Sequence, residues 1–166
     1  MKKKHEYTVC FLFDDSLENI LLVRKDRTEF QGRLNGVGGE IDYDTPPYET
    51  PDQGAIREIQ EETGIAYENL QSLGLTRIAR LGMLSLPHDC KYPDGDGCVL
   101  HYYAAAMKPG VKHTETTDTG EALVMEPVDA ILASNVGSDR YAGNGDLQYF
   151  VNAGLSALRR YLPGKE

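Results

Sequence analysis

One helix-forming segment constrains this chain of 166 residues more than any other stretch. It begins at Thr50-Pro51-Asp52-Gln53, where an N-cap threonine, a proline at the first helical position and a glutamine at the third make a capping box. The helix is predicted to run to Thr63, and Gly64 then supplies the left-handed residue that commonly follows a helix. Local chemistry therefore predicts both ends of this helix before any tertiary contact is considered.

The same helix gathers three carboxylates on one side. With about 100° between successive residues, Glu58, Glu61 and Glu62 fall within an arc of about 100°. Like charges at these spacings repel one another and destabilise an isolated helix. A hard divalent cation such as Mg²⁺ or Mn²⁺ would remove that penalty, because it prefers carboxylate and water oxygens. A solvated acidic face is the ordinary alternative for a pair of glutamates.

Two neighbouring features favour the metal over the solvated face. Arg57 lies four residues before Glu61, so its guanidinium can hold a carboxylate in place. The loop Gly36-Val37-Gly38-Gly39 precedes the helix and allows the backbone to approach a metal or a phosphate closely. We therefore predict a metal-binding site between this loop and the helix.

The rest of the pattern predicts a mixed sheet with helices packed on it. Strands are expected over residues 7–13, 19–25, 70–84, 98–107 and 122–125, and a break of the third strand near Gly74 or Gly82 is left open. Residues 87–97 are expected to form a hairpin loop. The first two should form an antiparallel pair, a helical turn is expected at 128–132, and an amphipathic helix is expected at 146–161. Because no repeat or linker interrupts the pattern, we expect residues 1–166 to form a single domain of the α/β class.

Composition bounds the partners of the chain. Its net charge of −9 disfavours long nucleic acids, because proteins that bind them gain affinity by neutralising phosphates. No apolar run is long enough to span a membrane, and the short stretch after the basic start runs into Asp14-Asp15, unlike a signal peptide. Three cysteines do not make a disulfide framework. We therefore expect a cytoplasmic protein that binds no membrane.

The helix and the residues before it resemble the Nudix box, written G-x5-E-x7-R-E-U-x-E-E-x-G-U with U an aliphatic residue. Glu49, seven further residues and then the run from Arg57 to Ile65 (REIQEETGI) match every defined position of that part. The sequence departs from the box upstream, where nine residues instead of five separate Gly39 from Glu49. The extra residues should extend the loop of residues 42–48.

The resemblance to the MutT-like Nudix hydrolases implies an α/β/α sandwich in which the box helix and a C-terminal helix pack on a mixed sheet. It also implies an enzyme that uses Mg²⁺ or Mn²⁺ to cleave a diphosphate linkage in a small nucleotide. The metal ligands implied are Glu58, Glu61, Glu62 and the carbonyl of Gly38. Arg57 and Glu49 would orient them, and the base would be Glu58, Glu61 or a carboxylate from residues 115–121. A homodimer is left open.

Residues 32–40 are also similar to the corresponding stretch of mammalian oxidised-purine nucleoside triphosphatases. In that subgroup an asparagine before the glycine loop helps to read the base, which implies this role for Asn35, although Asn-Gly is also a common turn. The substrate-binding residues expected are Asn35, Thr8, Gly39, Asp139 and Asp146. The substrate expected is a nucleoside triphosphate, with oxidised purines among the candidates, cleaved to the monophosphate and pyrophosphate.

Three other functions were weighed. A hydrolase of nucleoside diphosphate-X compounds such as ADP-ribose is the main alternative. A sensor that binds a nucleotide without cutting it would be expected to lose metal-binding glutamates, and this chain retains all three. An RNA decapping enzyme would be expected to carry a basic stripe, which is absent from this acidic sequence.

A zinc site is the remaining candidate for a metal centre. His88, Cys90, Cys98 and His101 are the residue types that tetrahedral zinc prefers. The His-x-Cys spacing is unusual, however, and Cys98 and His101 are placed on opposite faces of a strand by their separation. We therefore predict ordinary loop and strand residues at these positions.

Overall fold

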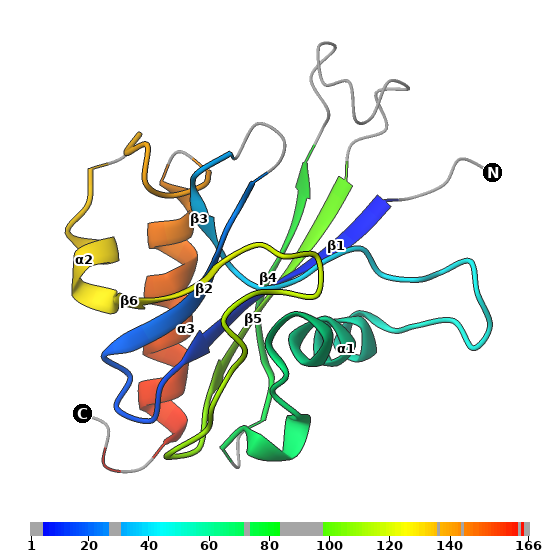
Figure 1. Cartoon of the computed structure of the whole chain (residues 1–166), viewed down its shortest axis with the longest axis horizontal. Helices are drawn as coiled ribbons and strands as arrows, with labels where there is room; N and C mark the ends of the chain where they lie inside the picture. Colours follow the sequence, from blue (N-terminus) through cyan, green and yellow to red (C-terminus); the bar gives the residue numbers. More distant parts are fainter. Residues whose placement is uncertain are drawn as a thin grey trace.

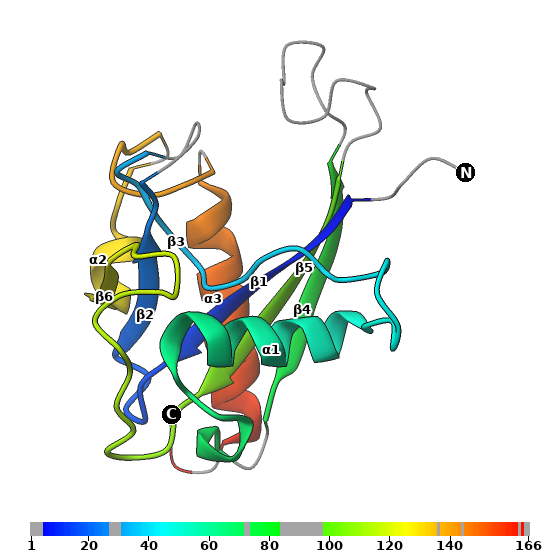
Figure 2. The same ribbon diagram turned by 45° about the vertical axis from the view of Figure 1, so that its right-hand side comes forward.

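A computed structural model describes residues 5–26, 31–71, 74–83, 98–135, 137–143, 145–162 and 164. A six-stranded sheet lies between helices on its two faces (Figures 1 and 2). The strands are β1 (His5–Phe13), β2 (Asn19–Arg24), β3 (Leu34–Asn35), β4 (Thr76–Met83), β5 (Cys98–Ala106) and β6 (Leu123–Pro127). The helices are α1 (Pro51–Thr63), α2 (Val128–Leu132) and α3 (Asp146–Tyr161), with a 3₁₀ turn, η2, at Tyr67–Asn69.

The strand β1 lies at the centre of the mixed sheet. It pairs in parallel with β5 along its whole length and antiparallel with β2 at only two positions, Leu12 to Leu21 and Phe13 to Ile20. Beyond these positions β2 continues alongside β6 and β3. The sheet therefore divides, and Figure 2 shows β2, β3 and β6 diverging from β1, β4 and β5.

Alternation along β1 distributes its side chains between two hydrophobic cores. The cluster under α3 includes Phe11 and Phe13, whereas the cluster under α1 includes Cys10, Leu12 and Ile59. Full burial of an aliphatic or aromatic side chain of this size contributes about 1.5–3 kcal/mol of hydrophobic stabilisation. The second cluster holds α1 against the sheet and so places this helix next to the glycine loop (Figure 2).

Local chemistry sets the ends of α1 as predicted. Thr50 accepts a hydrogen bond from the backbone N–H of Gln53, and the Gln53 side chain accepts one from the backbone N–H of Thr50. Gly64 adopts φ 72° and donates its N–H to the carbonyl of Gln60. The predicted capping box and the predicted C-terminal glycine are both confirmed.

Most of the other predicted elements are also confirmed. The α/β/α sandwich with a mixed sheet forms, and the predicted segments at 7–13, 19–25, 98–107, 122–125, 128–132 and 146–161 appear as β1, β2, β5, β6, α2 and α3. The predicted loop over residues 87–97 lies outside the described residues. Within the described part of the chain, no helix is long and apolar enough to cross a membrane.

The predicted start of the strand at residue 70 is wrong. Tyr67–Asn69 forms a 3₁₀ turn, and Leu70 makes only an isolated bridge to Met107. Gly74 then turns the chain at φ 60°, with its N–H bonded to the carbonyl of Gln71. The strand β4 begins only at Thr76. The apolar residues of this stretch suggested a longer strand, but the break left open near Gly74 is present, because the left-handed glycine conformation ends any extended run across it.

Residues 138–142 are hydrogen-bonded to the outer edge of β3. Leu34 donates its N–H to the carbonyl of Arg140 at 2.8 Å and accepts from the N–H of Ala142 at 2.9 Å. On β6, the buried carboxylate of Glu126 accepts hydrogen bonds of 2.7 Å from two guanidinium nitrogens of Arg140 and from the Tyr141 hydroxyl. The bonds from Arg140 outweigh the effect of burial and lower the pKa of Glu126.

This anchor predicts a pH-dependent contribution to stability. Because the folded-state pKa of Glu126 lies below its ordinary value of 4.5, the contribution is present above that value and is lost as the pH falls through the lower, folded-state pKa. Since Arg140 is half exposed, Glu126→Gln should lower the free energy of unfolding by only about 1–2 kcal/mol near neutral pH. Urea denaturation should show this deficit shrinking below about pH 4. Glu18→Gln, at an exposed position, is the control; an equal loss there would contradict the assignment.

Candidate active site

The glycine loop lies too close to its neighbours to carry side chains. Thr8 donates its N–H to the carbonyl of Gly39 at 2.9 Å, which ties the loop to β1. A Cβ on Gly38, where φ is 150°, would overlap the carbonyl oxygen of Thr8. A Cβ on Gly39 would lie 2.6 Å from the carboxylate of Glu58. Backbone and carboxylate therefore approach each other as closely as glycine allows.

Two glutamates of α1 lie against this loop, Glu62 buried and Glu58 half-buried. The Oε2 atom of Glu62 accepts a hydrogen bond of 2.8 Å from the N–H of Gly38. Burial raises the pKa of Glu62 to about 7. Burial also raises the pKa of Glu58, although hydrogen bonding to Arg57 opposes it. Both carboxylates are thus held where ionisation is unfavourable unless a cation comes close.

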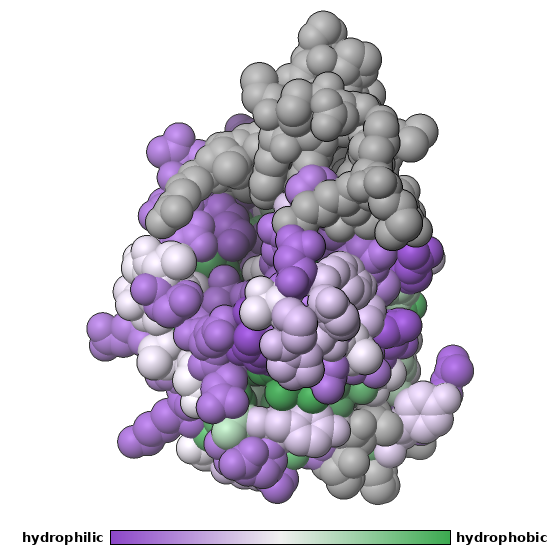
Figure 3. All heavy atoms as spheres, turned by 90° about the vertical axis from the view of Figure 1, so that its right-hand side faces the viewer, coloured by the Kyte–Doolittle hydropathy of each residue, from purple (hydrophilic) through white to green (hydrophobic). Residues whose placement is uncertain are grey.

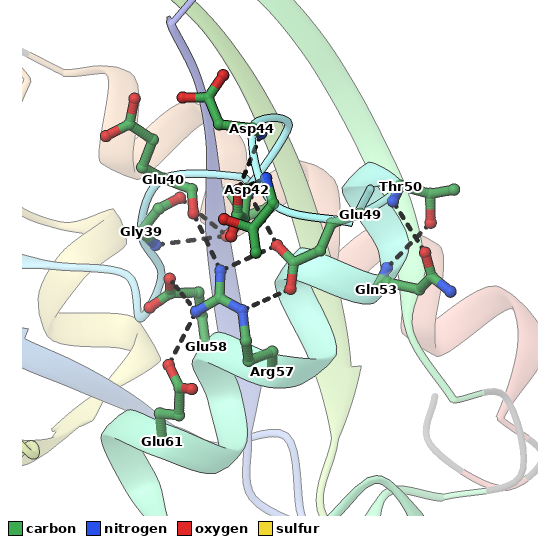
Figure 4. Close-up of polar contacts among 12 residues, drawn as sticks. Gly39, Glu40, Asp42, Asp44, Glu49, Thr50, Gln53, Arg57, Glu58 and Glu61 are labelled. Atoms are coloured by element: carbon green, nitrogen blue, oxygen red, sulfur yellow. Dashed lines mark hydrogen bonds and ion pairs between the residues drawn. The ribbon is translucent and has the colours of Figure 1, made fainter. Parts of the chain in front are cut away.

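The guanidinium of Arg57 organises the outer part of the cluster (Figure 4). It binds both carboxylate oxygens of Glu49, at 2.5 and 3.0 Å. It also contacts Glu58 at 2.7 Å, Glu61 at 2.8 Å and the carbonyl of Glu40 at 3.0 Å. Hydrogen bonding to Arg57 lowers the pKa of Glu49. Arg57 and Glu49 therefore lie where their predicted orienting role requires.

The donor set fits a hard divalent cation. Its side-chain donors are all carboxylates, which Mg²⁺ and Mn²⁺ prefer, and among the described residues no hydrogen bond is donated to the Gly38 carbonyl. No three acidic, histidine or cysteine side chains in the described ranges already form a metal shell. The hydrogen bonds account for this, because Arg57 binds Glu58 and Glu61 while Glu62 turns toward Gly38.

A half-buried lysine that the sequence pattern did not single out lies near these glutamates. Lys25, directly after β2, lies 3.2 Å from the carboxylate of Glu121, which also accepts the N–H of Asp26 at 3.1 Å. The charge of Lys25 lowers the pKa of Glu62, and that of Glu121 raises it. The signal was available, because Lys25 follows Leu21 and Val23 at the alternation of an inward strand face.

The loop of residues 115–121, one of the sources predicted for the base, lies beside α1. Its Glu121 is buried and engaged by Lys25, as described above. Its Asp118 is exposed, and the negative charge of Asp118 contributes to the raised pKa of Glu58. Asp118 is therefore the more accessible of these two carboxylates near the site.

Three of the predicted substrate residues share the face of the sheet that α1 covers. Asn35 pairs with Val23, a residue packed near the cluster under α1, and its Oδ1 accepts the N–H of Gly36 at 2.8 Å. Thr8 is only 2% exposed, and its hydroxyl contacts both the N–H and the carbonyl of Gly39 at 3.4 Å. Thr8 thus supports the glycine loop from behind.

The other two predicted substrate residues lie elsewhere. Asp139 is almost fully exposed and contacts Arg33 at 3.3 Å. Asp146 is the first residue of α3, and its charge helps to raise the pKa of Tyr102, which belongs to the cluster under α3. No contact among the described residues joins either aspartate to Glu58 or Glu62. Their role in substrate binding stays a prediction.

The zinc alternative gains no support from the part that can be described. The Nε2 atom of His101 lies 2.7 Å from a carboxylate oxygen of Glu6, so this nitrogen already has a partner. His88 and Cys90 lie outside the described residues.

Figure 3 turns toward the viewer the side of the molecule that carries the segment before α1. Most of the described atoms on this face belong to hydrophilic residues. Such a surface suits a charged and hydrated ligand better than an apolar one.

Comparison with known proteins agrees with this geometry. The family model of the NUDIX domain matches residues 3–141, and the chain therefore belongs to the Nudix family. It is a Nudix hydrolase that cleaves a diphosphate linkage in a nucleotide, and the family generally uses divalent metal ions. No curated protein matches the chain significantly.

Solved structures share the fold at low sequence identity. The E. coli dihydroneopterin triphosphate pyrophosphohydrolase has a TM-score of 0.68 at 14% identity, over 94% of this chain and 99% of that one. The NUDIX domain of Shewanella oneidensis NrtR, complexed with ADP ribose, has a TM-score of 0.66 at 18% identity, over 92% and 88%. A C. elegans Ap4A hydrolase has a TM-score of 0.65 at 15% identity, over 95% and 99%.

The two loop glycines should fail in different ways when a methyl group is added. Gly39→Ala meets only the flexible end of Glu58, so the free energy of unfolding should change by less than about 1 kcal/mol while turnover falls about tenfold or more. Gly38→Ala meets backbone at a left-handed φ and should cost about 2 kcal/mol or more of stability. Chemical denaturation and steady-state kinetics on both variants check this. Full activity in a stable Gly39→Ala protein would show that Glu58 is not needed where it lies.

Proposed function

We propose that this Nudix hydrolase binds Mg²⁺ or Mn²⁺ through Glu58, Glu61 and Glu62 and cleaves a purine nucleoside triphosphate to the monophosphate and pyrophosphate. The observation that carries the metal part is the close approach of the half-buried Glu58 to Gly39 and of the buried Glu62 to Gly38. Buried carboxylates with raised pKa values gain most from a nearby cation.

The side chains of the site divide the work of hydrolysis. Glu58, Glu61 and Glu62, with the Gly38 carbonyl, would hold the cation, which when bound supplies charge neutralisation and polarises the phosphate oxygens. Arg57 and Glu49 keep the carboxylates oriented, as their hydrogen bonds indicate. Glu58, Glu61 or Asp118 would accept the proton of the water that attacks phosphorus. The exposed position of Asp118 favours its access to solvent.

Removal of one ligand charge tests the metal part. Glu61→Gln keeps the shape of the side chain but removes the charge of a metal ligand, so it should reduce turnover by orders of magnitude. Because Glu61 is half exposed and contributes little to the core, circular dichroism should show an unchanged fold. Activity should disappear on chelation and return with Mg²⁺ or Mn²⁺. A loss of less than about tenfold, or about 1.4 kcal/mol, would exclude Glu61 from the metal site.

The nucleoside triphosphate assignment is supported by the order of groups along one face of the sheet. Asn35 shares the face of Val23, and Lys25 follows Val23 on the same face. The ammonium of Lys25 is in turn near Glu121 and close enough to influence Glu62. A ligand with its base at Asn35 and its diphosphate at the glutamates would therefore pass a lysine, which suits a phosphate chain.

Asn35 also has a defined hydrogen-bonding capacity. One lone pair of its Oδ1 accepts from the N–H of Gly36, and a second lone pair is left. The NH₂ group donates, and it would pair with an acceptor on the edge of a base such as a purine carbonyl or N7. Asn35 would therefore favour bases that present an acceptor at this position.

ADP-ribose is the rival substrate, because one similar Nudix domain was solved in complex with it. The other similar structures include hydrolases whose names give dihydroneopterin triphosphate and Ap4A. A binding protein without activity is the second rival. The retained glutamates argue against it, and phosphate release with and without Mg²⁺ would distinguish the two.

A substrate panel tests the base assignment. The value of kcat/KM should be highest for 8-oxo-dGTP or dGTP among 8-oxo-dGTP, dGTP, ATP and ADP-ribose. Asn35→Ser keeps an acceptor for Gly36 but removes the amide donor, so it should lower kcat/KM for the preferred purine about tenfold and leave the metal requirement unchanged. If ADP-ribose is preferred by about tenfold or more, the base-reading role of Asn35 is wrong.

A further inference from the structure

The segment between the glycine loop and α1 is four residues longer than the family spacing. Its start is tied to β1 by the contact of Glu40 with His5 at 3.1 Å and by the bond from the N–H of Ile41 to the carbonyl of Glu6 at 2.9 Å, and the side chain of Tyr43 ties it further along. The hydroxyl of Tyr43 donates a hydrogen bond of 3.0 Å to Oε2 of Glu6 on β1. The Nε2 atom of His101 on β5 lies 2.7 Å from the same oxygen. Glu6 is 9% exposed and His101 is 2% exposed, so the longer segment reaches a buried carboxylate.

The chemistry of this cluster keeps Tyr43 as a donor. Burial opposes the ionisation of Glu6, but hydrogen bonds from His101 and Tyr43 outweigh it and lower the pKa of Glu6. Burial and the contact with Glu6 raise the pKa of Tyr43 to about 12. The carboxylate is therefore charged and the phenol is neutral at ordinary pH.

The other nitrogen of His101 fixes the tautomer. Its Nδ1 atom is buried and has no hydrogen-bond partner among the described residues. A proton on this nitrogen would be a buried donor without an acceptor, which costs about 1–3 kcal/mol. Nε2 therefore carries the proton that faces Glu6. The carboxylate of Glu6 is held by two donors, Tyr43 and His101.

Residues before and after Tyr43 along the chain contact the arginine cluster. Glu40 gives its carbonyl to Arg57 at 3.0 Å. Asp42 exchanges two hydrogen bonds with Glu49, one to the backbone and one to the side chain, each 3.0 Å long. Glu49 in turn binds the guanidinium of Arg57. Tyr43 therefore anchors the segment between Glu40 and Glu49, the two residues of the segment that bind Arg57. Figure 4 shows Glu40, Asp42, Glu49 and Arg57.

We propose that Tyr43, backed by Glu6 and His101, is a positioning residue for the metal-binding glutamates. Its bond to Glu6 holds the lengthened segment against β1, so that Glu49 and the Glu40 carbonyl close on Arg57. Arg57 then presents Glu58 and Glu61 together. Arg57 lies one step behind the metal ligands, where removal of a residue typically changes metal affinity about 10–100-fold. Tyr43 acts through Arg57, so its removal should give an effect at the lower end of that range. The inference rests on the proposed metal centre and goes beyond it by assigning a role to the longer segment.

A matched pair of tyrosine variants tests this role through Mn²⁺ binding, measured by titration calorimetry without nucleotide. Tyr43→Phe should raise the dissociation constant for Mn²⁺ about tenfold and lower kcat, with KM for the nucleotide changed less. Tyr48→Phe makes the same change in the same segment at a side chain that is 64% exposed, and it should alter neither the dissociation constant for Mn²⁺ nor kcat. Equal Mn²⁺ affinity in wild type and Tyr43→Phe would overturn the proposal, as would a loss of stability alone.

A second variant tests whether Tyr43 acts through Glu6. Glu6→Gln should raise the dissociation constant to a similar degree, and the double variant should raise it no further than either single one. Full additivity in this cycle would overturn the shared route. A wild-type protein that binds no Mn²⁺ would instead remove the metal centre on which the inference rests. Failure of the proposed function and failure of this inference are therefore distinguishable.

Discussion

Four acceptor groups from α1 and the segment before it converge on the guanidinium of Arg57, and the positions of the other groups in the site depend on this side chain. Carboxylates on neighbouring helical turns repel one another, so Glu58 and Glu61 need a positive charge between them. A guanidinium has five donors in a rigid plane and can serve several acceptors at once, which an ammonium does less well. The same contacts join Glu49 and the Glu40 carbonyl to the helix, so one residue sets the position of both sides of the site.

Close approach of the backbone is the second requirement. The glycine loop lies between β1 and α1, with Thr8 on one side of it and the carboxylates of Glu58 and Glu62 on the other. Packing of Ile59 and Cys10 in the cluster under α1 fixes the height of the helix above the sheet. With this height fixed, the absence of side chains at Gly38 and Gly39 decides whether the carboxylates can reach the loop.

The charge balance of the site connects this geometry with function. Five carboxylates lie around the loop and the helix, namely Glu49, Glu58, Glu61, Glu62 and Glu121, and the cations that contact them are Arg57 and Lys25. Negative charge is left over at a partly buried place, which favours a divalent cation. An anionic diphosphate would meet repulsion without that cation, so metal binding and substrate binding are coupled by electrostatics.

The sequence by itself determined α1 and its ends, the spacing of its glutamates and most of the strands, because these depend on neighbours along the chain: a capping box, a helical repeat, an alternating strand. The start of β4 was determined only in part: the sequence marked Gly74 as a candidate break, but the apolar pattern does not report the left-handed conformation that this glycine adopts. Only the tertiary structure determined which residues support the glutamates of the site from outside α1. Tyr43 meets Glu6 across 37 positions, and Lys25 meets Glu121 across 96. Such contacts depend on which strands lie side by side, and the packing of the two cores sets that order.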